Sequence, residues 1–232
     1  MPEQAKIEFS TGQSVTAIAY PATQDRAGLT LILGHGAGAG QTSDFIVSFA
    51  SGLTTRGIDM VTFNFSYMEQ SRRIPDPNER LEASYHAVIE VVRERIKPTG
   101  DGLAIGGKSM GGRIASQVAA AGIGDLAGLV FLGYPLHPPG RLDHLRAKHL
   151  TAIKAPMLFV QGSRDAFGTP DELRPIITRL EPPADLYVLE GGDHSFKVPK
   201  RSVIKQEAVY DTIQDHIAAW LRATTKSRNR RN

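Results

Sequence analysis

Ser109 stands in a short glycine-rich motif that is typical of a nucleophilic serine. The motif, Gly107-Lys-Ser-Met-Gly111, has the form G-x-S-x-G. It follows an apolar run, Leu103–Gly106, and precedes a stretch with helical spacing, Met110–Ala121. A sharp strand-to-helix turn of this kind lifts a serine hydroxyl above the edge of a sheet, and glycines let the two backbones pass closely. The pattern predicts that Ser109 is a catalytic nucleophile.

The same residues also fit a phosphate-binding pattern, G-x-x-x-x-G-K-[ST], from Gly102 to Ser109. A P-loop needs a strand before its first glycine and a flexible loop between the two glycines. Here a turn-like segment, residues 96–101, precedes Gly102, and Leu103-Ala-Ile105 has the composition of a strand. We therefore keep a nucleotide-binding P-loop protein only as a remote alternative.

Two further residues are candidates to complete a catalytic triad with Ser109. Asp165 and His194 each follow a predicted strand of their own, and the chain order of serine, acid and histidine is the one that accompanies this serine motif. His194 would accept the serine proton, and Asp165 would orient the imidazole and stabilise its cation. Asp193 is an alternative acid, but its position next to His194 makes a good approach to the imidazole unfavourable.

A second glycine-rich stretch, Gly34–Gly40, follows the first strand of the alternating series. It fits a dinucleotide-binding fingerprint, G-x-G-x-x-A, but the acidic residue expected at the end of the next strand is missing. In a hydrolase, a main-chain N–H of such a loop joins the N–H of the residue after the serine to bind an oxyanion. We assign these donors to Ala37 and Met110, with Gly36 or Gly38 as alternatives to Ala37.

Apolar, β-branched runs alternate with helical patterns along the chain. The expected strands are Lys6–Ser10, Ser14–Tyr20, Leu29–Leu33, Met60–Phe65, Leu103–Gly106, Leu129–Tyr134, Met157–Gln161 and Asp185–Leu189. The expected helices are Asp44–Arg56, Glu79–Ile96, Met110–Ala121, Asp171–Leu180 and Ser202–Ala223. The first two strands predict an antiparallel hairpin. The alternation that follows predicts an α/β fold, a mostly parallel sheet with helices on both faces, and places a site at the carboxyl ends of its strands.

The composition is that of a globular chain and argues against several classes of function. The 232 residues include no cysteine and no long apolar run, and the first ten residues lack a signal-peptide pattern. The histidines show no metal-binding spacing. We therefore expect a cytoplasmic protein that needs no cofactor or metal and does not bind a membrane.

The net charge of +3 has its origin at the C-terminal end of the chain. Residues 222–232 hold five of the 27 Lys and Arg residues and no acid, which leaves 22 basic against 24 acidic residues before them. We expect one domain over residues 1–221 and a basic, disordered tail over residues 222–232. A basic tail is able to contact a polyanion, but the rest of the chain gives no such signal, so nucleic-acid binding is not expected.

Several sequence blocks together make the chain resemble the α/β-hydrolase superfamily over residues 14–221. It is most similar to a small capless group related to dienelactone-hydrolase-like esterases. The blocks are His35–Gly40 (HGAGAG), Gly106–Arg113 (GGKSMGGR), Gly133–Gly140 (GYPLHPPG), Gln161–Gly168 (QGSRDAFG) and Gly191–Phe196 (GGDHSF). The resemblance implies a triad of Ser109, Asp165 and His194 that hydrolyses a carboxylic ester or a related acyl bond. The chain departs from the group at Ser66, where proline is usual.

Only 22 residues separate Tyr134 from Met157, where larger hydrolases insert a cap domain. We therefore expect an open site with little or no lid. Lys108 and Arg113, which flank the serine motif, are expected to be structural or surface groups.

Three residues are candidates to contact the substrate: His35, Arg72 and Arg73. We expect His35 to shape the loop that binds the oxyanion, through a hydrogen bond, and not to act as a base. An arginine presents a fixed fork that suits a carboxylate or phosphate, so Arg72 or Arg73 would read an anionic group of the substrate. The alternative is that both arginines pair with the nearby Asp76 and Glu79.

The sequence favours a serine hydrolase that cleaves a carboxylic ester or thioester of a small molecule through an acyl-enzyme on Ser109. Its alternative is a hydrolase-fold scaffold with little turnover, because some eukaryotic relatives of the group look like subunits of chromatin-associated assemblies. The oligomeric state and the identity of the substrate are left open.

Overall fold

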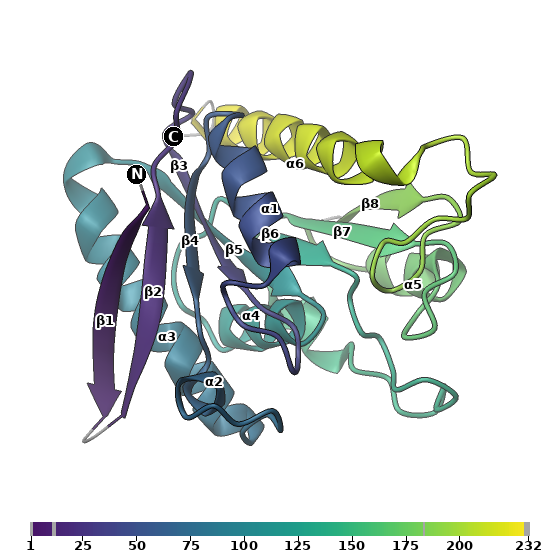
Figure 1. Cartoon of the computed structure of the whole chain (residues 1–232), viewed down its shortest axis with the longest axis horizontal. Helices are drawn as coiled ribbons and strands as arrows, with labels where there is room; N and C mark the ends of the chain where they lie inside the picture. The colour runs from purple at the N-terminus through teal and green to yellow at the C-terminus, as the bar shows by residue number, and fades with distance from the viewer. Residues whose placement is uncertain (1, 11–12, 183, 230–232) are drawn as a thin grey trace.

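The computed structural model describes residues 2–10, 13–182 and 184–229, which build a single eight-stranded sheet (Figure 1). The strand order across the sheet is β1-β2-β4-β3-β5-β6-β7-β8. The strands are β1 (Glu3–Ser10), β2 (Gln13–Tyr20), β3 (Leu29–Gly34), β4 (Asp59–Phe63), β5 (Gly102–Lys108), β6 (Gly128–Leu132), β7 (Met157–Gly162) and β8 (Ala184–Leu189). The helices are α1 (Asp44–Thr54), α2 (Ser66–Glu69), α3 (Asn78–Ile96), α4 (Met110–Ala120), α5 (Pro170–Ile177) and α6 (Gln206–Asn229), with short 3₁₀ turns at η1 (Lys97–Thr99) and η2 (Lys148–Ala152).

The pairing of the strands confirms the expected fold class. β1 and β2 form an antiparallel hairpin, and β2 pairs antiparallel with β4. From β4 across β3 and on to β8, every pair of neighbours is parallel. The carboxyl ends of β3 to β8 therefore meet along one edge of the sheet, which is where ligands bind in folds of this kind.

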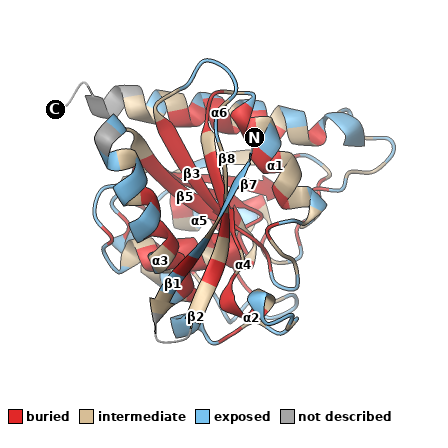
Figure 2. Ribbon diagram, turned by 60° about the vertical axis from the view of Figure 1, so that its left-hand side comes forward, coloured by how far each residue is buried: buried red, intermediate tan, exposed pale blue. Residues whose placement is uncertain are grey.

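Helices cover both faces of the sheet (Figures 1 and 2). On one face, Phe49 of α1 packs with Ile213 of α6 against the sheet. On the other face, Tyr85 of α3, Ile114 of α4 and residues of α5 form a second apolar layer. The inner strands β3 to β7 are buried almost throughout, as their continuous apolar runs predict, and the two helical layers hold their ends in place.

The chain has a short connection where a cap domain would be inserted. Between β6 and β7, within the described residues 133–156, the only helix or strand is the turn η2. The expectation of a minimal cap is confirmed. Among the described residues, no helix is both long and apolar enough to cross a bilayer.

The phosphate-binding alternative is excluded by the start of β5. The strand begins at Gly102 and continues through Lys108. The residues that would have to form a flexible loop between the two glycines are therefore held in the middle of the sheet, where Ala104 and Ile105 pair with β3 and β6.

Helix α6 extends past the expected boundary at residues 221 and 222 and ends at Asn229. Arg222 donates to the backbone oxygens of Asp25, at 3.1 Å, and Arg56, at 2.8 Å. The segment after it contains no glycine or proline, the two residues that oppose a helix most strongly. The expected disordered tail is thus helical up to Asn229, and residues 230–232 lie outside the described part of the chain.

Candidate active site

Ser109 lies on a sharp turn between β5 and α4, as its motif predicts. Its backbone has φ 50° and ψ −113°, a strained conformation for a residue with a side chain. The turn needs the glycines around it: a Cβ on Gly107 would lie 2.5 Å from the carbonyl carbon of Gly111, and a Cβ on Gly111 would collide with the backbone of Gly34. This turn places the hydroxyl of Ser109 above the carboxyl edge of the sheet.

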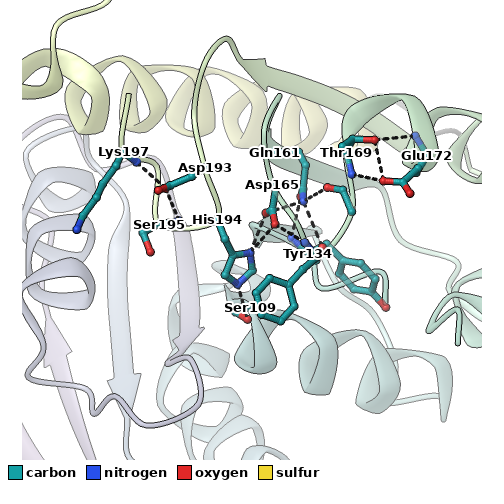
Figure 3. A network of polar contacts seen from close by, with 12 residues as sticks. Ser109, Tyr134, Gln161, Asp165, Thr169, Glu172, Asp193, His194, Ser195 and Lys197 are labelled. Atoms are coloured by element: carbon teal, nitrogen blue, oxygen red, sulfur yellow. Dashed lines mark hydrogen bonds and ion pairs between the residues drawn. The ribbon is translucent and has the colours of Figure 1, made fainter. Parts of the chain in front are cut away.

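His194 joins Ser109 to Asp165 through hydrogen bonds at both ring nitrogens (Figure 3). Its Nδ1 lies 2.8 Å from Oδ2 and 3.0 Å from Oδ1 of Asp165. A carboxylate only accepts hydrogen bonds, so Nδ1 carries the proton and Nε2 is left as an acceptor. Nε2 lies 2.8 Å from Oγ of Ser109, where it is placed to receive the hydroxyl proton. The structure thus brings together three residues that lie up to 85 positions apart in sequence.

Asp165 is buried and its carboxylate is held by two donors besides the imidazole. The backbone N–H of Phe167 donates to Oδ1 at 2.8 Å, and Nε2 of Gln161 donates to Oδ2 at 2.9 Å. The ring of Phe167 also stacks on the imidazole of His194, with their centroids 4.2 Å apart. These contacts fix the direction of the carboxylate toward the imidazole.

Gln161 is a residue of the site that the sequence analysis did not identify. Its buried amide also donates to the backbone oxygen of Gly168, at 2.7 Å, and accepts the backbone N–H of Tyr134, at 2.8 Å (Figure 3). One side chain therefore ties the loop after β6 to the loop that carries Asp165. The available signal was a polar residue near the end of an otherwise apolar buried strand, since such a group must find partners there.

Asp193 contacts the backbone and not the imidazole. Its Oδ1 accepts the N–H groups of Ser195, at 2.8 Å, and Lys197, at 2.9 Å (Figure 3). It closes the turn that presents His194, and the alternative of Asp193 as partner of the imidazole does not hold.

The loop after β3 packs against the serine turn. A Cβ on Gly36 would lie 3.8 Å from Cβ of Ser109, so this part of the loop lies next to the nucleophile. Ala37 follows in the turn that the N–H of Ala39 closes on the oxygen of Gly36, at 3.2 Å. Met110 opens α4, where backbone N–H groups have no acceptor within the helix. The two expected oxyanion donors therefore belong to segments that adjoin Ser109.

His35 is completely buried, which corrects its assignment as a substrate contact. The N–H of Phe65 donates to its Nε2 at 3.1 Å, so Nδ1 carries the proton and donates to the oxygen of Gly36 at 2.8 Å. Burial lowers the pKa of His35 to about 4. The residue is a neutral cross-link between the loops after β3 and β4, and its hydrogen bond to Gly36 lies within the first of these loops.

Arg72 pairs with an acid of its own segment, as the alternative reading expected. Its Nη2 lies 2.6 Å from Oδ1 of the buried Asp76, and Arg80 lies 3.5 Å from the same oxygen. Neither Arg72 nor Arg73, which is exposed, lines the hollow beside Ser109. The structure therefore does not bring either arginine to the nucleophile.

An open hollow of about 470 Å³ lies beside Ser109 and His194. Its walls are largely apolar and include Phe45, Phe167 and Tyr210. In the described part of the chain, His, Cys, Asp and Glu residues form no group of three that is able to hold a metal ion. The arrangement suits chemistry by an activated hydroxyl on a small molecule.

A family profile for the alpha/beta hydrolase domain matches residues 27–222. The chain belongs to this family. Among solved structures, an alpha-beta serine hydrolase homologue from Coxiella burnetii is 19% identical, has a TM-score of 0.71, and the match covers 95% of this chain and 96% of the homologue. A serine hydrolase without a lid from Xanthomonas campestris is 20% identical, with a TM-score of 0.70 and coverage of 97% and 94%.

Dienelactone hydrolase from Anabaena variabilis is similar to this alpha/beta hydrolase domain at 16% identity, with a TM-score of 0.70 and coverage of 94% and 96%. At these identities the likeness establishes the fold. It extends over almost the whole length of each chain.

Proposed function

We propose that this protein is a serine hydrolase that cleaves a carboxylic ester or thioester of a small molecule through an acyl-enzyme on Ser109. The observation that carries the proposal is the unbroken chain of hydrogen bonds from Oγ of Ser109 through His194 to the buried carboxylate of Asp165. An unassisted serine hydroxyl is a poor nucleophile, and this arrangement supplies the base that it needs.

In the first half of the reaction, Oγ of Ser109 attacks the acyl carbon as its proton passes to Nε2 of His194. Asp165 stabilises the imidazolium that forms and keeps the ring in its orientation. The N–H groups of Ala37 and Met110 donate to the oxyanion of the tetrahedral intermediate. When that intermediate collapses, the bond to the leaving oxygen or sulfur breaks, and His194 returns the proton to the leaving group.

In the second half, a water molecule gives a proton to Nε2 of His194 and attacks the acyl carbon of the ester on Ser109. The second tetrahedral intermediate expels Oγ, which takes the proton back, and the carboxylic acid leaves. The resting state is restored with no net change in the protein. The apolar hollow and the absence of a cap between β6 and β7 support a site that admits small apolar or aromatic acyl groups from solvent.

Covalent labelling by a fluorophosphonate tests the proposal, because the reagent reacts with activated serines. Wild type should label at one site, and Ser109→Ala should abolish labelling and lower turnover of p-nitrophenyl acetate by up to roughly a million-fold. Ser195→Ala is the matched control, since Ser195 is an exposed serine next to His194 and its variant should still label. A well-folded wild type that does not label would overturn the proposal in favour of the scaffold alternative.

A further inference from the structure

Lys108, the residue before the nucleophile, buries a positive charge in the catalytic centre. Its aliphatic chain passes the loop after β3, with Cγ 3.6 Å from the point where a Cβ on Gly36 would lie. Its Nζ is shielded from solvent and has no hydrogen-bond partner among the described residues. The sequence analysis expected a structural or surface group, and the burial of Nζ excludes the surface position.

The ammonium group lies between two aromatic rings and one edge of the catalytic histidine. Nζ is 5.8 Å from the ring centroid of Phe45 and 5.7 Å from that of Phe196, which are cation–π distances. The third neighbour is Gly133. The point where a Cβ on Gly133 would lie is 3.0 Å from Nζ of Lys108 and 3.4 Å from Nδ1 of His194. A side chain at position 133 would therefore contact both the ammonium and His194.

Two carboxylates lie within electrostatic range of this ammonium, and the imidazole of His194 adjoins the same glycine. Asp165 comes from the loop after β7, and Asp193 and His194 come from the loop after β8. Burial lowers the pKa of Lys108 to about 8, against the opposing attraction of Asp165 and Asp193. Lys108 therefore still carries its proton at neutral pH, and in the resting state it supplies the positive charge that offsets the buried carboxylate of Asp165.

Stability alone does not account for a lysine at this position. Burying an ammonium group without a hydrogen-bond partner opposes folding. A methionine has a similar length and would fill the space between the rings of Phe45 and Phe196 without that penalty. A residue that destabilises the fold and lies next to the reacting groups is expected to have a role in the reaction.

We propose that Lys108 is a positioning residue of the catalytic centre, whose buried positive charge opposes protonation of His194 and so keeps the imidazole free to accept the proton of Ser109. The inference rests on the function proposed above. The carboxylate of Asp165 attracts a positive charge on the imidazole. The ammonium balances that attraction, and it also makes the imidazolium a better acid toward the leaving group.

The test is the rate of fluorophosphonate labelling as a function of pH in wild type and in Lys108→Met. In the pH profile of the labelling rate, removing the positive charge should move the midpoint of the acidic limb upward by about one to two pH units. A shift of this size is expected for a unit charge close to the imidazole of His194. Labelling at pH 6 should become roughly tenfold slower or more. The difference should narrow above pH 9, where Lys108 of the wild type has lost its proton too.

A purely structural lysine would give a different result. It would lower the melting temperature and slow labelling equally at all pH values, with an unchanged midpoint, and that outcome overturns the inference. If Lys108→Met does not fold, Lys108→Gln gives the same comparison. Lys197→Met removes an exposed charge from the loop of His194, and its midpoint should move far less because solvent screens that charge. Failure of the proposed function is distinct, since the wild type itself would then not label.

Discussion

The loops after β3 and β8 each present a histidine at the carboxyl edge of the sheet, and the two histidines do different work. His35 is completely buried, and both ring nitrogens bond to the backbone, at Gly36 and Phe65. The side chain of His194 is 20% exposed, and its nitrogens bond to the side chains of Asp165 and Ser109. In both rings Nδ1 carries the proton, so the tautomer is the same.

The difference lies in what each Nε2 accepts. Nε2 of His35 is occupied by an amide N–H that cannot give up its proton, so the ring remains neutral and links two loops. Nε2 of His194 faces a hydroxyl that can transfer its proton, beside a carboxylate that stabilises the resulting cation. Residue type alone therefore does not distinguish a structural histidine from a general base; the chemistry of the partners does.

The comparison of the two histidines predicts the largest loss of turnover when the base, His194, is removed. His194→Ala should lower turnover of p-nitrophenyl acetate by about 10⁵- to 10⁶-fold, close to the loss in Ser109→Ala, because the two residues act as a unit. The double variant should be hardly slower than either single variant. Steady-state kinetics on the three proteins measures this, and losses that add in the double variant would contradict a shared role.

A smaller effect is expected when the partner of the base is changed and the base is kept. In Asp165→Asn, an NH₂ group replaces either Oδ1, which accepts from Phe167, or Oδ2, which accepts from Gln161. Both positions lie within 3.0 Å of Nδ1 of His194, so in either orientation the NH₂ can donate only to Nδ1. The ring must then present Nδ1 as an acceptor and Nε2 as a donor toward Ser109, and kcat should fall by about 10⁴-fold. A loss of less than tenfold in a folded variant would mean that Asp165 does not set the tautomer.

The smallest effect on turnover, and the largest on folding, is expected at His35. His35→Phe leaves the N–H of Phe65 and the oxygen of Gly36 unpaired, which should reduce the free energy of unfolding at pH 7.5 by about 2 to 3 kcal/mol. Turnover should fall by roughly tenfold through the displaced loop, well below the 10²- to 10³-fold cost of losing an oxyanion donor. Urea unfolding and p-nitrophenyl acetate kinetics measure the two effects.

The pH dependence of folding sharpens the same comparison. Because the pKa of His35 is about 4 in the fold and near 6.5 when unfolded, the unfolded chain binds the extra proton first as pH falls through this window. His35 therefore costs the wild type roughly 2 kcal/mol of stability on going from pH 7.5 to pH 5. The difference in free energy of unfolding between wild type and His35→Phe should therefore be smaller at pH 5 by that amount. A difference that does not change with pH would show that His35 is not a buried neutral group.

The sequence was sufficient for the sheet and for the three residues brought together at its edge. Alternating apolar runs determine which segments are strands, and the glycines beside Ser109 specify a local turn. Contacts made by long side chains, or by residues far apart in the chain, could not be predicted from the sequence. The burial of Nζ of Lys108 depends on rings at positions 45 and 196. For Arg72 the sequence left two roles open, a substrate contact or a pair with Asp76, and only the folded loop shows the pair. The backbone acceptors that Asp25 and Arg56 supply to the side chain of Arg222 likewise come from distant segments.

Gln161 has a consequence for how variants of this protein should be read. Its one amide bonds to Asp165, to the backbone of Gly168 and to the backbone of Tyr134, so the acid and the two loops around it behave as one mechanical unit. A mutation far along either loop that pulls on this amide would rotate the carboxylate and appear in kinetics as a defect of proton transfer. Libraries of variants that reshape the rim between residues 134 and 168 should therefore vary the two loops together and keep Gln161 fixed. A change in one loop alone would also displace the carboxylate of Asp165.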